Sequence, residues 1–207
     1  MAASIGNTTF GTSAGGGVAH NNNGSTIVVF LHNESAARTV ADVAYGGESM
    51  EPEIVTRTSD CRGYAFILEN APSGSNQLTF TPSADTWYHA IYSIVDGGEK
   101  GDHNSDVVSQ QSGSNCRAPV STQDANSVVV ASIIRRYTTA AMTPQNMTED
   151  DQRTFHDGRA AAGHAQGTGG SVDLWWNWAS TENAVLIAVE VLEKAVIKDQ
   201  SMSSWFW

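Results

Sequence analysis

Three oxygen-bearing side chains repeat at alternate positions in one polar segment of the chain. Asp102, Asn104 and Asp106 have the spacing of ligands in a calcium-binding loop. Val107 stands at the sixth position, where an EF-hand loop needs glycine, and Gly113 at the twelfth, where it needs glutamate. The segment therefore does not encode an EF-hand. A calcium turn of another kind and a plain polar turn stay open, and composition favours the polar turn.

Two other patterns have the spelling of catalytic motifs. Residues 11–15 read GTSAG, the G-x-S-x-G of serine hydrolases, but that motif needs a following helix, and further glycines follow here instead. Glu48, Glu51 and Glu53 are close together, as the carboxylate pair of a glycosidase must be, but Pro52 disfavours the regular strand that would align them. We therefore expect no catalytic residue, no cofactor and no enzymatic activity.

The first of two aromatic clusters could bind a ligand. Leu174 and Trp176 alternate with Asp173, Trp175 and Asn177, so the two sets point to opposite faces of a strand. Leu174 and Trp176 are expected in the core. A tryptophan between hydrogen-bonding residues suits the stacking of a sugar ring, so Asp173, Trp175 and Asn177 are a candidate glycan site. A second buried face explains Trp175 equally well.

The second aromatic cluster is Trp205, Phe206 and Trp207, which follows a small, polar segment at 201–204. Three neighbouring aromatic side chains would make an exposed apolar patch unless they pack against something. We expect them to anchor the protein to another subunit or to the surface of an assembly. Packing against the same chain is the alternative.

Charge and composition exclude several classes of partner. The chain has 207 residues, with 22 acidic and 11 basic side chains and a formal net charge of −11. The basic residues are scattered, so we expect neither a nucleic acid nor an anionic membrane as a partner. No segment approaches the roughly 20 apolar residues of a membrane span. Residues 1–7 lack the basic and apolar regions of a signal peptide, so we expect synthesis in a cytoplasm.

Short apolar runs bounded by turn residues indicate the fold class. Residues 87–95 and 128–134 are apolar on both faces, which is typical of central strands. The pattern predicts an all-β protein, an antiparallel two-sheet jelly-roll sandwich with little helix. The strongest predicted strands are 26–31, 64–68, 77–81, 87–95, 127–134 and 184–192.

The remaining segments set the expected domain organisation. We expect an N-terminal arm and Gly/Asn-rich loop over 1–25, one sandwich over 26–192 and an aromatic tail over 193–207. Within the sandwich, residues 96–119 are expected as a long surface excursion, and Thr148 as the N-cap of a short helix.

The two cysteines, Cys61 and Cys116, lie among turn residues beside predicted strands, where a disulfide is geometrically feasible. A chain without a secretory leader meets a reducing cytosol first, which favours free thiols. The sequence leaves the bonded and free states open.

Several strands and turns together resemble a known family. The residues are VADVAYGG at 40–47, LENAPSG at 68–74 leading into Leu78–Phe80, a late Trp-rich strand, and the closing strand around Ala188–Glu190. Over residues 26–192 the chain is similar to the concanavalin-like jelly-roll domains of bacteriophage virion proteins and of some bacterial surface proteins. These motifs specify turns and core, so the resemblance implies a fold and a setting but no site residue.

The resemblance, the acidic surface and the aromatic tail together favour a non-enzymatic virion structural protein, either a capsid decoration protein or a tail or fibre component. Its expected partners are other virion proteins, copies of itself and glycans, and its expected location is the virus particle. The alternative is a carbohydrate-binding module of a surface or secreted protein. A glycan-active enzyme is the third hypothesis and ranks last, because it needs a pair of carboxylates in a groove and the sequence aligns no such pair.

Overall fold

The computed structural model describes residues 2–83, 85–108, 114–180 and 182–195. All regular structure in these residues is antiparallel β-strand, which confirms the predicted all-β sandwich class. In the part of the chain that the structure describes, no helix is long and apolar enough to cross a membrane.

The first half of the chain folds into a two-sheet sandwich, here called the N-terminal sandwich. Its larger sheet, the inner N sheet, has the order β1-β9-β3-β7-β6, and its smaller sheet, the outer N sheet, has the order β2-β8-β4-β5. The strands are β1 (Ser4–Ser13), β2 (Val18–Asn22), β3 (Thr26–Asn33), β4 (Val40–Tyr45), β5 (Glu48–Ser49), β6 (Pro52–Arg57), β7 (Arg62–Glu69), β8 (Gly74–Pro82) and β9 (Trp87–Val95).

The second half repeats this arrangement as a C-terminal sandwich. Its inner C sheet has the order β10-β17-β12-β15-β14, and its outer C sheet has the order β11-β16-β13. The strands are β10 (Gly97–Val108), β11 (Asn115–Ser121), β12 (Val128–Arg135), β13 (Thr143–Gln145), β14 (Thr148–Phe155), β15 (Gly158–Gln166), β16 (Ser171–Asn177) and β17 (Ala184–Glu193).

The two sandwiches have the same topology. Replacing β1, β9, β3, β7 and β6 by β10, β17, β12, β15 and β14 turns one inner sheet into the other. The outer sheets correspond in the same way, β2-β8-β4 with β11-β16-β13. Two interleaved sheets in this order form a jelly roll. The chain therefore contains two jelly rolls where the sequence predicts one sandwich over residues 26–192, and β1 and β2 extend the first of them before residue 26.

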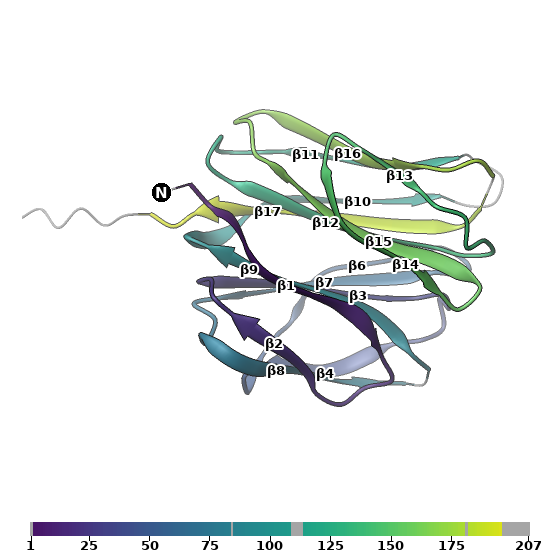
Figure 1. The fold of residues 1–207 in the computed structure, drawn as a ribbon, viewed down its shortest axis with the longest axis horizontal. Coiled ribbons are helices and arrows are strands. Elements are labelled where there is room, and N and C mark those ends of the chain that lie inside the picture. Colours follow the sequence, from purple (N-terminus) through teal and green to yellow (C-terminus); the bar gives the residue numbers. More distant parts are fainter. Residues whose placement is uncertain (1, 84, 109–113, 181, 196–207) are drawn as a thin grey trace, which may run out of the picture.

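The four sheets stack as four layers, with the outer C sheet at the top of Figure 1 and the outer N sheet at the bottom. Each sandwich has its own core: Ile27, Val29 and Ile91 belong to the N-terminal one. A third core lies between the two inner sheets and includes Phe30 from β3 and Ile187 from β17. A single residue, Asp96, separates β9 from β10, so the chain passes directly from one inner sheet to the other.

The burial patterns explain why the layers are arranged this way. Every residue of β3 and β12 is buried, because each inner sheet is covered on both faces. In β11 and β16 of the outer C sheet, buried and more exposed residues alternate, because one face meets the core and the other meets solvent.

Three segments that the sequence does not predict as strands form strands in the structure. Residues 1–25, expected as an arm and loop, contain β1 and β2, and residues 96–119, expected as a surface excursion, contain β10 and most of β11. Thr148, expected to cap a helix, begins β14. These segments are rich in Gly, Ser, Asn and Asp, which disfavour strands locally. Each long strand is stabilised by pairing with a neighbour: β1 with β9, β10 with β17, and β14 with β15.

Both cysteines are buried and free. Cys61 belongs to the core between the inner sheets, whereas Cys116 belongs to the core of the C-terminal sandwich. The inner C sheet therefore separates the two thiols. Burial raises the pKa of both thiols, which keeps them protonated and unreactive.

Hydrogen bonds at the rim of the shared core join the two sandwiches. The hydroxyl groups of Tyr88 and Tyr92 on β9 donate to Asp151 at 3.1 Å and to Asp150 at 3.0 Å on β14. Asp150 also lies 2.8 Å from His164 Nδ1 on β15. Burial, followed by these carboxylates, raises the pKa of both tyrosines well above the usual value. The tyrosines therefore remain donors across the interface.

Three buried histidines are neutral in the folded chain. Burial lowers the pKa of His20 to about 4, of His32 to about 3 and of His89 to about 4. His20 is hydrogen-bonded to Thr9 and Ser93, whereas neither ring nitrogen of His32 has a hydrogen-bond partner among the described residues.

These histidines predict a loss of stability in acid. The unfolded chain binds protons at them near pH 6.5, so between about pH 6.5 and about pH 4 the unfolded state holds more protons than the folded state. The free energy of unfolding should therefore fall as the pH falls through that window. His32→Phe removes one of these histidines, so the free energy of unfolding should fall less steeply with pH, by the slope that one proton contributes. Urea titrations at several pH values measure the free energy of unfolding, with His103→Gln, a substitution of an exposed histidine, as the control. Equal slopes against pH for the natural chain and the two variants would contradict the prediction.

Candidate functional site

The solvent face of the outer C sheet holds the predicted glycan-site residues. Asp173, Trp175 and Asn177 are partly exposed on one face of β16, while Leu174 and Trp176 are buried on the other. The alternation predicted for this strand is confirmed. Trp175 therefore does not belong to a second buried face.

The strand register gives Trp175 neighbours that the sequence did not indicate. Arg117 on β11 is paired with Trp175 on one side, and Gln145 on β13 on the other. The Arg117 guanidinium lies 5.1 Å from the centroid of the Trp175 ring. Arg117 Nε also donates to both carboxylate oxygens of Asp173 at 2.7 Å. This bonding and the Asp173 charge raise the pKa of Arg117.

This surface combines an aromatic ring with charged and polar groups. The indole ring is partly exposed with the Arg117 guanidinium over it, and the arginine, aspartate and amide groups around it offer donors and acceptors. One end of the surface adjoins a hollow of ≈ 360 Å³ that Asp173 also lines, together with Asn146 and Ser171. The Asn146 side chain donates to the Asp173 carbonyl at 2.9 Å, which fixes that edge.

The side chains of the three calcium candidates hydrogen-bond to a neighbouring strand. Their side chains join the edge of the inner C sheet to the edge of the outer C sheet. Asp102 accepts from the Ser121 backbone N–H at 2.9 Å, and Asp106 accepts from the Arg117 N–H at 2.8 Å. Between them, Asn104 donates to the Pro119 carbonyl at 2.6 Å.

Side chains two positions apart in a strand point to the same face, so Asp102, Asn104 and Asp106 of β10 all reach backbone groups of β11. Proline has no N–H, and this explains why the middle residue is an asparagine, which can donate, rather than a third aspartate. In the described residues, no group of three or more His, Cys, Asp or Glu side chains could hold a metal ion.

This arrangement predicts the effect of one nearly isosteric substitution. Asn104→Asp places a carboxylate against the Pro119 carbonyl and removes the donor, so the free energy of unfolding should fall by about 1–3 kcal/mol. Calcium and a chelator should leave the melting temperature unchanged in both proteins. If these residues form a calcium site, a third carboxylate strengthens calcium binding, and calcium should raise the melting temperature of the variant. Such calcium-dependent stabilisation would overturn the edge-joining role.

The residues of the other two motifs make local contacts. Ser13 is the last residue of β1, and its hydroxyl donates to the Gly15 carbonyl at 3.0 Å in a turn. Glu53 is ion-paired with Lys100 of the C-terminal sandwich, while Glu48 and Glu51 are exposed. The three glutamates therefore do not line a common groove.

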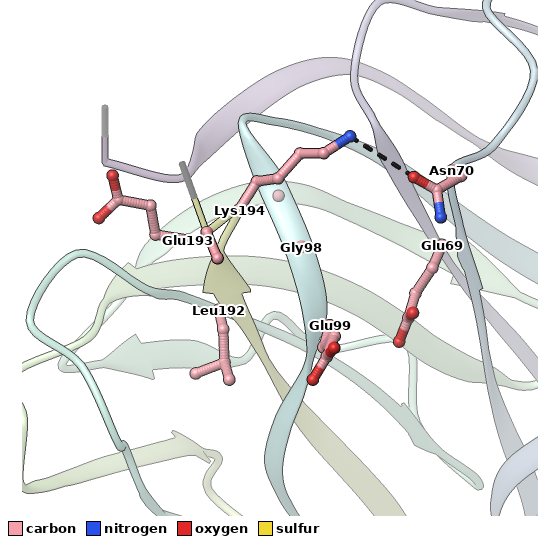
Figure 2. A pocket seen from close by; sticks show the side chains of 9 residues that line it. Glu69, Asn70, Gly98, Glu99, Leu192, Glu193 and Lys194 are labelled. Atoms are coloured by element: carbon pink, nitrogen blue, oxygen red, sulfur yellow. Dashed lines mark hydrogen bonds between the residues drawn. The ribbon is translucent and has the colours of Figure 1, made fainter. Parts of the chain in front are cut away.

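A hollow of ≈ 350 Å³ lies where the chain passes between the sandwiches, and Figure 2 shows it. Glu69, Glu99 and Glu193 line it, and Lys194 Nζ donates to Asn70 Oδ1 at 3.5 Å. The last described residue, Ala195, also lines this hollow. The predicted anchor, Trp205, Phe206 and Trp207, lies outside the described residues.

No family model, curated protein or solved structure matches this chain.

Proposed function

We propose that this chain is a non-enzymatic structural protein of a virus particle, serving as a capsid decoration protein or as a tail or fibre component. The observation that carries the proposal is the fusion of two jelly rolls through a shared apolar core. Ile94 of β9 and Val189 of β17 are both fully or almost fully buried in that core. Such a doubly covered block has little freedom to bend between its halves and presents two outer sheet faces to neighbours.

The charge of the chain supports the same proposal. A net charge of −11 keeps single copies apart in solution, so attachment needs a local apolar contact. The aromatic residues at 205–207 supply one. Burying three such rings contributes several kcal/mol, at roughly 25 cal/mol per Å² and 150–250 Å² per ring.

Deleting residues 205–207 tests the anchoring role. We expect the truncated protein to melt at the same temperature as the full chain, because the buried residues of the three described cores all lie between Ala3 and Val191. Self-association and attachment to the particle should weaken. Analytical ultracentrifugation measures the first, and the copy number on purified particles measures the second. Unchanged assembly, or unfolding of the truncated monomer, would refute the role.

A second candidate function, carbohydrate binding, rests on the Trp175 surface. A half-exposed indole beside Asp173 and Asn177 on an open sheet face is suited to stacking a sugar ring. On this proposal the particle or surface that carries the protein binds a glycan through the outer C sheet.

Substitutions at Trp175 test this second function. Trp175→Ala should abolish retention on polysaccharide, because it removes the stacking plane, whereas Trp175→Phe should retain most of it. Binding to a glycan array and to insoluble polysaccharides gives the readout. Since Trp175 lies on a solvent face, neither variant should shift the melting temperature by more than a few degrees. Equal binding by both variants would exclude the Trp175 surface.

A further inference from the structure

A polar cavity, separate from the hollow of Figure 2, lies at one end of the interface between the two sandwiches. None of the sequence motifs contributes a residue to it. Its volume is ≈ 480 Å³, within the usual range for small-molecule sites. Asn33, Glu34, Arg38 and Asp85 line it from the N-terminal sandwich, and Arg136 and Asp157 from the C-terminal one. We call it the inter-sandwich cleft. It exists only because the two jelly rolls are packed together.

A buried carboxyl group forms part of this cleft. Glu34 is only 7% exposed, and its Oε1 atom has no hydrogen-bond partner in the described residues. Burial, and then the hydrogen bond and the charge of Asp157, raise the pKa of Glu34 to about 9. Glu34 is therefore neutral near pH 7 and donates a hydrogen bond to the Asp157 side chain.

The remaining groups balance in charge. Arg136 lies 3.8 Å from Asp157 and 3.3 Å from Asp60. The Arg38 guanidinium has no ion-pair partner among the described residues, although it lines the cleft. With Glu34 neutral, the residues that line the cleft include two arginines and two aspartates, while Asp60 pairs with Arg136 but does not line the cleft. The cleft is thus close to neutral in a chain of net charge −11.

The backbone at the cleft is held in an uncommon conformation. Asp85 has a φ of 77° and His156 a φ of 51°, and the two side chains lie 3.7 Å apart across the interface. Left-handed φ values cost energy for residues other than glycine, and such residues cluster at binding sites. Here they bring one residue from each sandwich to the mouth of the same cleft.

These features specify the chemistry of a ligand. No apolar residue is among those that line the cleft, so it does not suit an apolar ligand. A charged ligand would upset the charge balance. A neutral ligand that both donates and accepts hydrogen bonds suits it, because carboxylates accept from hydroxyl groups while guanidinium groups donate to them.

We propose that the inter-sandwich cleft binds a neutral saccharide, with Arg38, Asp85 and Asp157 bonding its hydroxyl groups. Glu34 is a positioning residue that holds Asp157. This site is distinct from the Trp175 surface, and it does not depend on the proposed structural role of the protein.

Titration of the ¹⁵N-labelled full chain with neutral mono- and disaccharides tests the proposal by NMR. Glucose, galactose, mannose, N-acetylglucosamine and their disaccharides serve as probes, with inorganic phosphate and glucuronate as charged comparators. At least one neutral sugar should shift the amides of residues 33–38, 85 and 156–157. No such shift, or shifts with the charged comparators alone, would overturn the proposal.

Matched variants separate the cleft from other surfaces. Arg38→Ala should weaken binding about tenfold or more, because a hydroxyl group of the bound sugar loses its hydrogen-bond donor. Arg57→Ala removes the same charge from the edge strand β6 and should have no effect, and Trp175→Ala should also leave this binding intact. Glu34→Gln should retain it, since glutamine keeps a neutral acceptor and a donor. Unchanged affinity in Arg38→Ala, or its loss in Trp175→Ala, would contradict the cleft site.

Discussion

Burial of both faces of the two inner sheets is the constraint on which the rest of the structure depends. The strands β3, β9, β12 and β17 carry apolar residues on both faces, so a single two-layer sandwich would leave one apolar face of each inner sheet in water. An outer sheet covers one face, and the other inner sheet covers the second. The direct passage from β9 to β10 through Asp96 places the two sandwiches face to face.

Polar chemistry is consequently displaced to the rims of the layers. Inside the stack, histidines are neutral and cysteines are protonated, because a charged group without a partner is too costly there. Where the inner sheets end, side chains from both sandwiches meet solvent and form the inter-sandwich cleft and the hollow of Figure 2. The outer sheets offer open surfaces of another kind, flat and half solvated, such as the one around Trp175.

Several polar groups that belong to the sequence motifs stabilise the packing of the layers. The carboxylates at 102 and 106 are used to join two sheet edges, and Glu53 is ion-paired across the sandwiches. Each of these polar groups stabilises the arrangement of the layers. The Trp175 surface and the inter-sandwich cleft are the two sites proposed for ligands.

Local sequence pattern determined the strand class, the central strands and the two faces of β16. Alternation and doubly apolar runs report on burial directly, because side chains in a strand alternate between its faces. The loop expected before residue 26 and the helix expected at Thr148 were wrong, because pairing with distant apolar strands overrides weak local propensity. Only the tertiary structure decided the duplication, the pairing of Arg117 with Trp175 and the meeting of Glu34 with Asp157. Each depends on register and on sheet packing between residues far apart in the chain, which no local pattern encodes.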